Sequence, residues 1–210
     1  FSEAMKEQLL IQILDLGFSK DDFDTVLDYM KNKAVICMHV RWTTVTNFLI
    51  EDTEMRNLFE ISKQDDSGTR AKAEANLFND FYNGTPATER PKYGGLNLFN
   101  SGSGVNACIG YGDCFVLPTR DALKRATFVF EDTFVFQQHI ATFDDCAHVL
   151  FYLDNTALTK LINIANGTLP YSNDSYGPYI DCQIHGKVLL SSDVEALYVP
   201  ADKINDPIVK

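Results

Sequence analysis

Three polar side chains of different chemistry alternate along residues 179–186, whose sequence is YIDCQIHG. Successive side chains of a strand point to opposite faces, so Asp181, Gln183 and His185 share one face and apolar residues share the other. A carboxylate, an amide and an imidazole in one row offer a negative charge, hydrogen bonds and a proton acceptor. We interpret this segment as a candidate catalytic strand; an amphipathic strand at a sheet edge explains the pattern equally well.

A second candidate is the β-rich segment 34–42, AVICMHVRW, which ends in basic side chains. Alternation places His39 and Arg41 on the same face of the predicted strand. Polar and charged groups are costly to bury without partners, so these two are suited to orienting an anionic ligand. A strand end that reaches solvent is the alternative.

Residues 83–112 form a third candidate, because they hold seven of the twelve glycines and three charged residues. Glycine allows backbone N–H groups to approach a ligand closely, and Arg90 offers a planar fork for phosphate. The sequence GSGVNA at 102–107 superficially matches a dinucleotide-binding fingerprint. The following CIGYG cannot continue as the required helix, so we reject a Rossmann site.

These candidates must be positioned by a helical first part and a strand-rich second part, which together predict an α+β fold. Residues 1–33 form an acidic helical hairpin packed on a domain spanning residues 34–210. Hydrophobic periodicity predicts helices over 2–16, 20–31, 47–61, 70–82, 121–125, 144–153 and 157–165. Strands are predicted over 34–42, 113–117, 127–130 and 179–186.

Composition narrows the function classes. The chain has 18 Lys and Arg against 29 Asp and Glu, a formal charge of −11, which disfavours nucleic acid and anionic membranes as partners. There are five cysteines and no C-x-x-C pair, which indicates a reducing compartment. Neither an export signal nor a long apolar run is present, so we expect a cytoplasmic protein. The spacing of Cys146 and His148 matches no metal-ligand motif, and we expect no metal.

Three motifs carry a resemblance to a known family. They are RPKYGGLNL at 90–98, YIDCQIHG at 179–186 and DVEAL at 193–197. Together they resemble a bacterial family long catalogued as a domain of unknown function and regarded as a divergent branch of the ADP-ribosyltransferase superfamily. The resemblance covers about residues 34–200 and implies a split, mostly antiparallel β-sandwich that binds NAD as co-substrate.

The resemblance also implies roles for individual residues. NAD binding falls on the first two motif strands and on one residue of the third: His39, Arg41, Arg90, Tyr93, Gly94 and His185. Tyr93 is expected to stack on nicotinamide. The catalytic acid falls on Asp181 or Gln183; relatives have Glu where this chain has Asp181.

Chemistry favours Asp181 over Gln183. Cleavage of the bond between nicotinamide and ribose passes through an oxocarbenium-like state, which a nearby carboxylate stabilises and an amide does not. Gln183 would then orient the ribose or the acceptor, and no metal is needed. The expected activity is mono-ADP-ribosylation of a protein side chain, Arg by resemblance.

The family includes an effector of an intracellular pathogen that modifies host NAD-dependent glutamate dehydrogenase. The same acceptor, and translocation into a host cytosol, are therefore implied for this chain. The alternative is a non-catalytic module that binds NAD or protein on the same fold.

Overall fold

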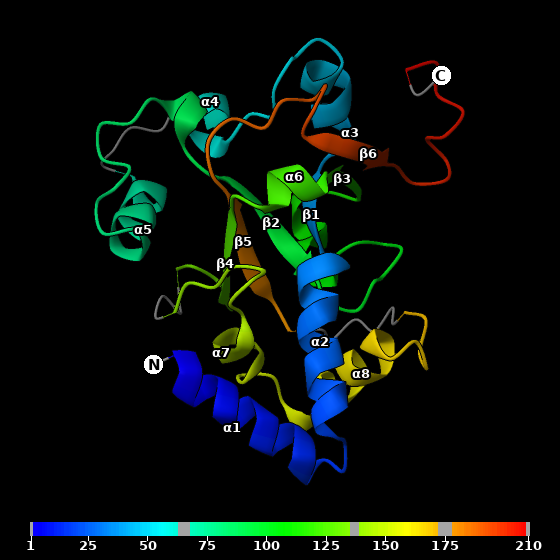
Figure 1. The fold of residues 1–210 in the computed structure, drawn as a ribbon. Helices are drawn as coiled ribbons and strands as arrows, with labels where there is room; N and C mark the ends of the chain where they lie inside the picture. Colours follow the sequence, from blue (N-terminus) through cyan, green and yellow to red (C-terminus); the bar gives the residue numbers. More distant parts are fainter. Residues whose placement is uncertain (1, 63–67, 135–138, 172–177, 209–210) are drawn as a thin grey trace.

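The fold begins with a helical hairpin, in a computed structural model that describes residues 2–62, 68–134, 139–171 and 178–208 (Figure 1). Helix α1 spans Ser2–Asp15 and helix α2 spans Lys20–Asn32. Ser19 caps α2 in a capping box: its hydroxyl accepts from Asp22 N at 3.2 Å, and its backbone N–H donates to the Asp22 carboxylate at 2.7 Å. Gly17, at φ +85°, makes the turn between the helices. Both predicted helices are confirmed.

A six-stranded antiparallel sheet forms the centre of the molecule, in the order β4-β5-β2-β1-β3-β6. The strands are β1 (Val35–Val40), β2 (Lys92–Asn97), β3 (Cys114–Pro118), β4 (Ala126–Phe130), β5 (Ile180–Ile184) and β6 (Val194–Tyr198). The predicted α+β class is confirmed. Four of these strands were predicted from local patterns; β6 was not assigned, and β2 lies in the glycine-rich segment 83–112, where only the resemblance implied a strand.

The sheet divides at β1. The first half of this strand, Val35 to Cys37, pairs with β2, and the second half, Met38 to Val40, pairs with β3. The recorded pairing of β1 with β2 ends at Cys37 and Gly95, although both strands continue beyond that point. The ends of β1 and β2 therefore separate on one side of the sheet.

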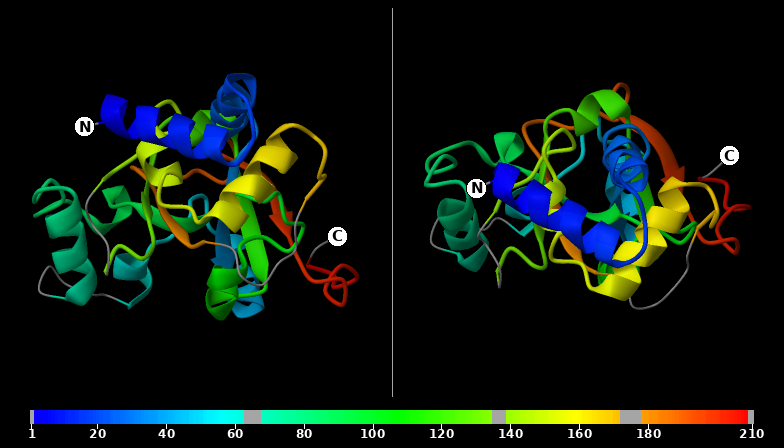
Figure 2. Two further views of the ribbon diagram at one scale, coloured as in Figure 1. Left: turned by 90° about the horizontal axis from the view of Figure 1, so that it is seen from below. Right: turned by 60° about the horizontal axis from the view of Figure 1, so that its bottom comes forward.

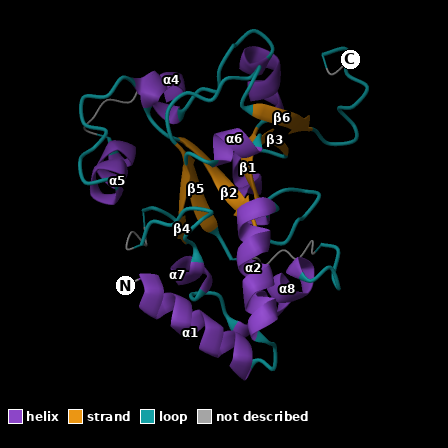
Figure 3. Cartoon of the chain, viewed as in Figure 1, coloured by secondary structure: helices purple, strands orange, loops and turns teal. Residues whose placement is uncertain are grey.

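One face of the sheet packs on helices. Ile36, Leu96, Phe128, Ile180 and Ile184 are buried in a single apolar core together with residues of α1, α2, α7 (Ala147–Leu150) and α8 (Asn155–Ala165). Helix α1 contacts α2 and α7, and α2 contacts α8. These four helices lie together below the sheet in Figures 1 and 3, and Figure 2 shows them from the other end.

The remaining elements are short. They are α3 (Trp42–Thr44), the π-helical turn η1 (Val45–Leu49), α4 (Leu58–Ser62), α5 (Thr69–Leu77), the 3₁₀ turns η2 (Ala87–Glu89) and η3 (Asn106–Tyr111), and α6 (Arg120–Leu123). In Figure 1, α4 and α5 lie at the upper left, apart from the four core helices.

The single helix predicted over 47–61 is wrong. Residues 53–55 are extended instead, because they pair with the segment after β5: Met55 N donates to Val188 O at 2.8 Å, and Leu190 N donates to Thr53 O at 2.9 Å. These long-range hydrogen bonds override the local helical periodicity. The helix predicted over 144–153 is likewise reduced to α7, since Thr142 and Asp145 close a turn before it.

Two further findings concern the whole described chain. Across the described ranges, no helix is long and apolar enough to cross a membrane. All five cysteines are free and buried.

Candidate functional site

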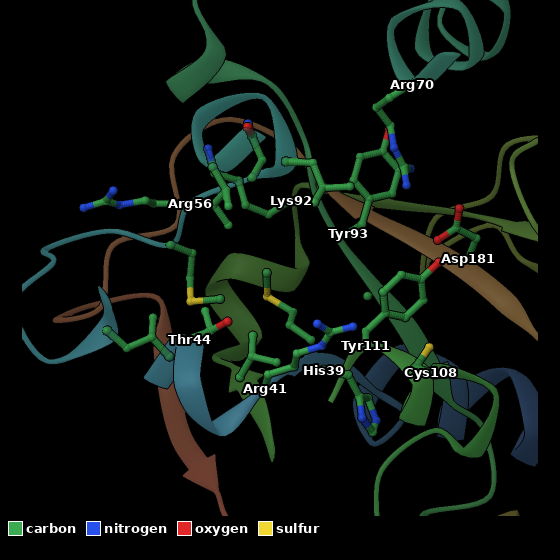
Figure 4. Close-up of a pocket in the computed structure, with 18 of the residues that line it drawn as sticks. His39, Arg41, Thr44, Arg56, Arg70, Lys92, Tyr93, Cys108, Tyr111 and Asp181 are labelled. Carbon is green, nitrogen blue, oxygen red and sulfur yellow. The ribbon is translucent and has the colours of Figure 1, made fainter. Parts of the chain in front are cut away.

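A cavity of about 420 Å³ opens where the ends of β1 and β2 separate (Figure 4). Its walls come from the second half of β1, the segment from Thr44 to Ile61, α5, the start of β2, η3 and the strand β5. Ligand pockets commonly enclose about 300–1,000 Å³, so this cavity is large enough for a small molecule. The three candidate segments of the sequence analysis, 34–42, 83–112 and 179–186, all contribute residues to its lining.

Charged side chains line the cavity. They are the cations Arg41, Arg56, Arg70 and Lys92 and the carboxylates Asp52, Asp132 and Asp181. The cations outnumber the carboxylates here, although the chain as a whole carries −11. Arg56 is held by Asp52 through two hydrogen bonds of 2.7 and 2.5 Å, and Lys92 donates to the backbone oxygens of Thr88 and Arg90. Among the described residues, neither Arg41 nor Arg70 is held by a hydrogen bond or an ion pair.

Arg41 follows the last residue of β1 and precedes α3, so the end of the strand carries it to the cavity. Its side chain is exposed and, within the part of the chain that the structure describes, has no hydrogen bond or ion pair. Figure 4 shows the guanidinium extended toward Tyr111. A guanidinium in this state is well suited to bind phosphate or carboxylate.

Asp181 lies on β5, on the cavity wall, and is 3% exposed. The Thr133 hydroxyl donates to Oδ2, the Thr133 backbone N–H donates to the same oxygen at 3.4 Å, and the Tyr179 hydroxyl donates to Oδ1 at 3.1 Å. Burial raises the pKa of Asp181, and the hydrogen bonds from Thr133 and Tyr179 and the charge of Arg70 oppose that rise. A fixed, partly desolvated carboxyl group therefore lines the cavity.

Tyr93 lies on β2, next to Asp181 in the cavity wall. Its hydroxyl donates to Glu74 Oε1 at 2.9 Å, and the guanidinium carbon of Arg70 lies 4.2 Å from the centre of its ring. The neighbouring Gly94 also lines the cavity. A Cβ at Gly94 would lie 2.7 Å from Ile36 Cγ2 and 2.9 Å from Cys37 O, so the approach of β2 to β1 requires glycine there.

Arg90 lies outside the cavity lining. It is 2% exposed, its Nη1 donates to Glu74 Oε2 at 2.8 Å, and its guanidinium carbon lies 4.3 Å from the centre of the Phe59 ring. Glu74 is buried and accepts from both Arg90 and Tyr93; burial raises its pKa and these two partners oppose the rise. Arg90, which was predicted to bind phosphate, instead belongs to a buried network with Glu74 and Tyr93. This network lies behind the Tyr93 side of the cavity wall.

Gln183 and His185 share a face with Asp181, as predicted, but neither lines the cavity. Gln183 is fully buried, and its Oε1 accepts from the Thr127 hydroxyl at 3.1 Å. The His185 ring contacts the same hydroxyl through Nε2 at 2.8 Å and the Tyr82 hydroxyl through Nδ1 at 2.5 Å. Burial lowers the pKa of His185. Both side chains thus form hydrogen bonds with neighbouring residues and do not line the cavity.

His39 lines the cavity, yet both ring nitrogens bind the backbone. Nε2 accepts from Val105 N at 2.9 Å, so Nδ1 carries the proton and donates to Gly112 O at 2.8 Å. Burial lowers the pKa of His39, which agrees with a neutral ring. Gly112, at φ +149°, leaves no room for a Cβ against Val40 O. The glycines of this segment were predicted to let backbone groups approach a ligand. Those after β2 instead let a loop close on β1.

Residues 37–173, from β1 past α8, match a family described as "Protein of unknown function (DUF3626)". The chain belongs to the DUF3626 family. The matched region includes Arg41, Arg70 and Tyr93 and ends before β5, which carries Asp181. A search of the curated proteins found no match.

The site residues that the sequence analysis did not single out include Arg70 and Glu74, both on α5. A signal for Glu74 was present, because it lies three residues from both Ala71 and Leu77 and so falls on the apolar stripe of the predicted helix. A carboxylate within an apolar stripe indicates a buried partner. Arg70 precedes Glu74 by one helical turn and shares its face.

Proposed function

We propose that this protein is a mono-ADP-ribosyltransferase, which transfers ADP-ribose from NAD to a protein side chain and releases nicotinamide. One observation supports the proposal most strongly. The strands to which the resemblance assigns the three superfamily motifs, β1, β2 and β5, are far apart in the sequence but adjacent in the sheet. They bring Arg41, Tyr93 and Asp181 to one cavity.

The cavity wall fits the parts of NAD. Arg41 has no protein partner among the described residues and lies on the cavity rim, where it would neutralise the diphosphate. Tyr93 offers an aromatic face for the nicotinamide ring. The opening of the sheet between β1 and β2 agrees with the split sheet that the resemblance implies.

Asp181 is the residue that we assign to the reaction. As the bond between ribose C1′ and the nicotinamide nitrogen breaks, both bonding electrons leave with nicotinamide and positive charge develops on the ribose. The Asp181 carboxylate stabilises that charge in a desolvated wall, where an electrostatic contribution is largest. A nucleophilic atom of the acceptor then bonds to C1′ and loses its proton. Gln183 is fully buried beside Thr127, which favours Asp181 over Gln183.

The acceptor follows from the resemblance alone. We propose an arginine on a protein, with host NAD-dependent glutamate dehydrogenase as the first candidate and delivery into a host cytosol as its setting. No nucleic acid is expected as a partner, because the chain carries −11.

The test is release of nicotinamide and transfer of label from labelled NAD to a protein acceptor. Purified protein should support both, and Asp181→Ala should abolish both while its circular dichroism and thermal transition remain those of a folded protein. Full activity of Asp181→Ala would exclude the assignment. Thermal stabilisation by NAD without any nicotinamide release would instead establish the alternative, a non-catalytic binding module.

A further inference from the structure

Arg70 occupies an unusual position in the cavity. Its guanidinium carbon lies 4.2 Å from the centre of the Tyr93 ring and 4.8 Å from the centre of the Phe134 ring. Figure 4 shows the guanidinium beside the Tyr93 ring and directed toward the region of Asp181. The two aromatic rings and the nearby carboxylate together favour a flat positive group at this point.

The contacts of Arg70 are almost entirely with these rings. Its Nε is buried without a hydrogen-bond partner, and among the described residues the side chain has neither a hydrogen bond nor an ion pair. Arg90 shows the contrast: it also lies over an aromatic ring, but Glu74 fixes it at 2.8 Å. Arg70 therefore has the chemistry of a group that a ligand can displace, because no hydrogen bond has to be broken.

The position of Arg70 coincides with the place proposed for nicotinamide. In NAD the nicotinamide ring is a planar, delocalised cation, and a guanidinium is a planar, delocalised cation as well. A surface that holds one of them on the face of Tyr93, beside Asp181, has the shape and charge to hold the other.

We propose that the Tyr93 face is a binding site for planar cations, that Arg70 occupies it in this structure, and that a ligand ring must displace Arg70 to bind. The existence of the site rests on the contacts of Arg70; its use by nicotinamide rests on the proposed function. Arg70 then lowers the apparent affinity of the ligand by the fraction of molecules in which it covers Tyr93.

The experiment uses 1-methylnicotinamide as the probe, a planar cation that lacks the rest of NAD. Arg70→Ala should bind it about tenfold more tightly than the unsubstituted protein, measured by the shift of tyrosine ring signals in NMR titrations. Methylguanidinium should compete for the same site. Methylammonium, a compact and strongly hydrated cation of equal charge, should not compete.

The matched control is Arg120→Ala, which removes another arginine near an aromatic ring, 5.9 Å from the centre of Phe143 and outside the cavity lining. It should bind the probe as the unsubstituted protein does. Arg70→Lys, which keeps the charge and the helix but removes the planar group, repeats the test if Arg70→Ala does not fold. Unchanged probe affinity in every folded Arg70 variant, or equal competition by methylammonium, would overturn the inference.

The same variants separate the inference from the proposed function. Probe binding by Arg70→Ala without any turnover of NAD by the unsubstituted protein would support the site and contradict the transferase. Weaker binding of NAD by Arg70→Ala, measured calorimetrically, would show that Arg70 is a ligand contact and not an occupant, and would overturn the inference.

Discussion

The cavity and the buried network behind it hold their arginines in opposite states. In the network, Arg90 and Tyr93 both donate to Glu74. In the cavity, Arg41 and Arg70 have no hydrogen-bonding partner within the described ranges. Burial and partners, rather than residue type, therefore separate the groups that hold the site together from the groups that a ligand can contact or displace.

The largest effect should come from breaking the network at Arg90. Arg90→Ala leaves Glu74 buried without its cation, and loss of one partner of a buried pair costs about 3–5 kcal/mol of unfolding free energy. Denaturant unfolding monitored by circular dichroism measures this loss. The control is Arg56→Ala, whose pair with Asp52 is partly exposed and should cost less than about 1 kcal/mol. Equal losses in the two variants would refute the distinction between network and cavity rim.

A substitution at Asp181 should lower activity and leave stability unchanged, whereas Arg90→Ala lowers stability. Asp181→Asn keeps the size of the side chain and removes its charge, so nicotinamide release should fall about 10²–10³-fold, as when one electrostatic stabiliser is removed. Stability near neutral pH should not fall. The matched variant is Asp121→Asn, an exposed aspartate of α6 paired with Lys124, which should retain normal release. A loss of stability as large as that of Arg90→Ala would place Asp181 in the network.

The sequence was sufficient for β1 and β5, because alternation of side chains is a local property of a strand. It assigned His39 and Arg41 to one face, and both side chains line the cavity. It failed for β2, since Gly94 and Gly95 disfavour strands locally. Their value appears only in three dimensions, where side chains at these positions would collide with Ile36 and Cys108.

The role of Arg90 was beyond the sequence for a related reason. An arginine in a glycine-rich segment matches a phosphate ligand, and nothing local reveals that a glutamate 16 residues earlier will meet it. The same α5 brings Arg70 to Tyr93. Contacts between elements decide such roles, whereas composition and periodicity describe single elements.

A smaller effect is expected at Arg41. Arg41→Ala should weaken NAD binding about tenfold through the loss of one charge-assisted contact, with unfolding free energy unchanged within about 0.5 kcal/mol, because an exposed side chain without partners contributes little to folding. Isothermal titration gives the affinity. Arg41→Lys should recover only part of it, since Lys lacks the planar fork. Unchanged affinity in Arg41→Ala would move the diphosphate contact elsewhere.

The smallest effect concerns how stability depends on pH. Burial raises the pKa of Asp181 above its ordinary 3.8, so the folded state binds its proton more tightly than the unfolded state does. This contribution to stability is therefore complete below 3.8 and is lost as the pH rises through the raised value. Glu74, whose pKa is also raised, acts in the same direction and remains in both proteins under comparison.

Asp181→Asn cannot ionise at this position, so its stability relative to the unsubstituted protein should increase as the pH rises from 3.8 through that window. The gain amounts to about 1.4 kcal/mol for each unit by which the pKa is raised. Urea unfolding of both proteins at several pH values measures the difference, in which the remaining titrating groups cancel. A difference that stays constant with pH would mean that the cavity solvates Asp181 as well as water does. The electrostatic argument for its role in the reaction would then fail, because that argument requires a desolvated carboxylate.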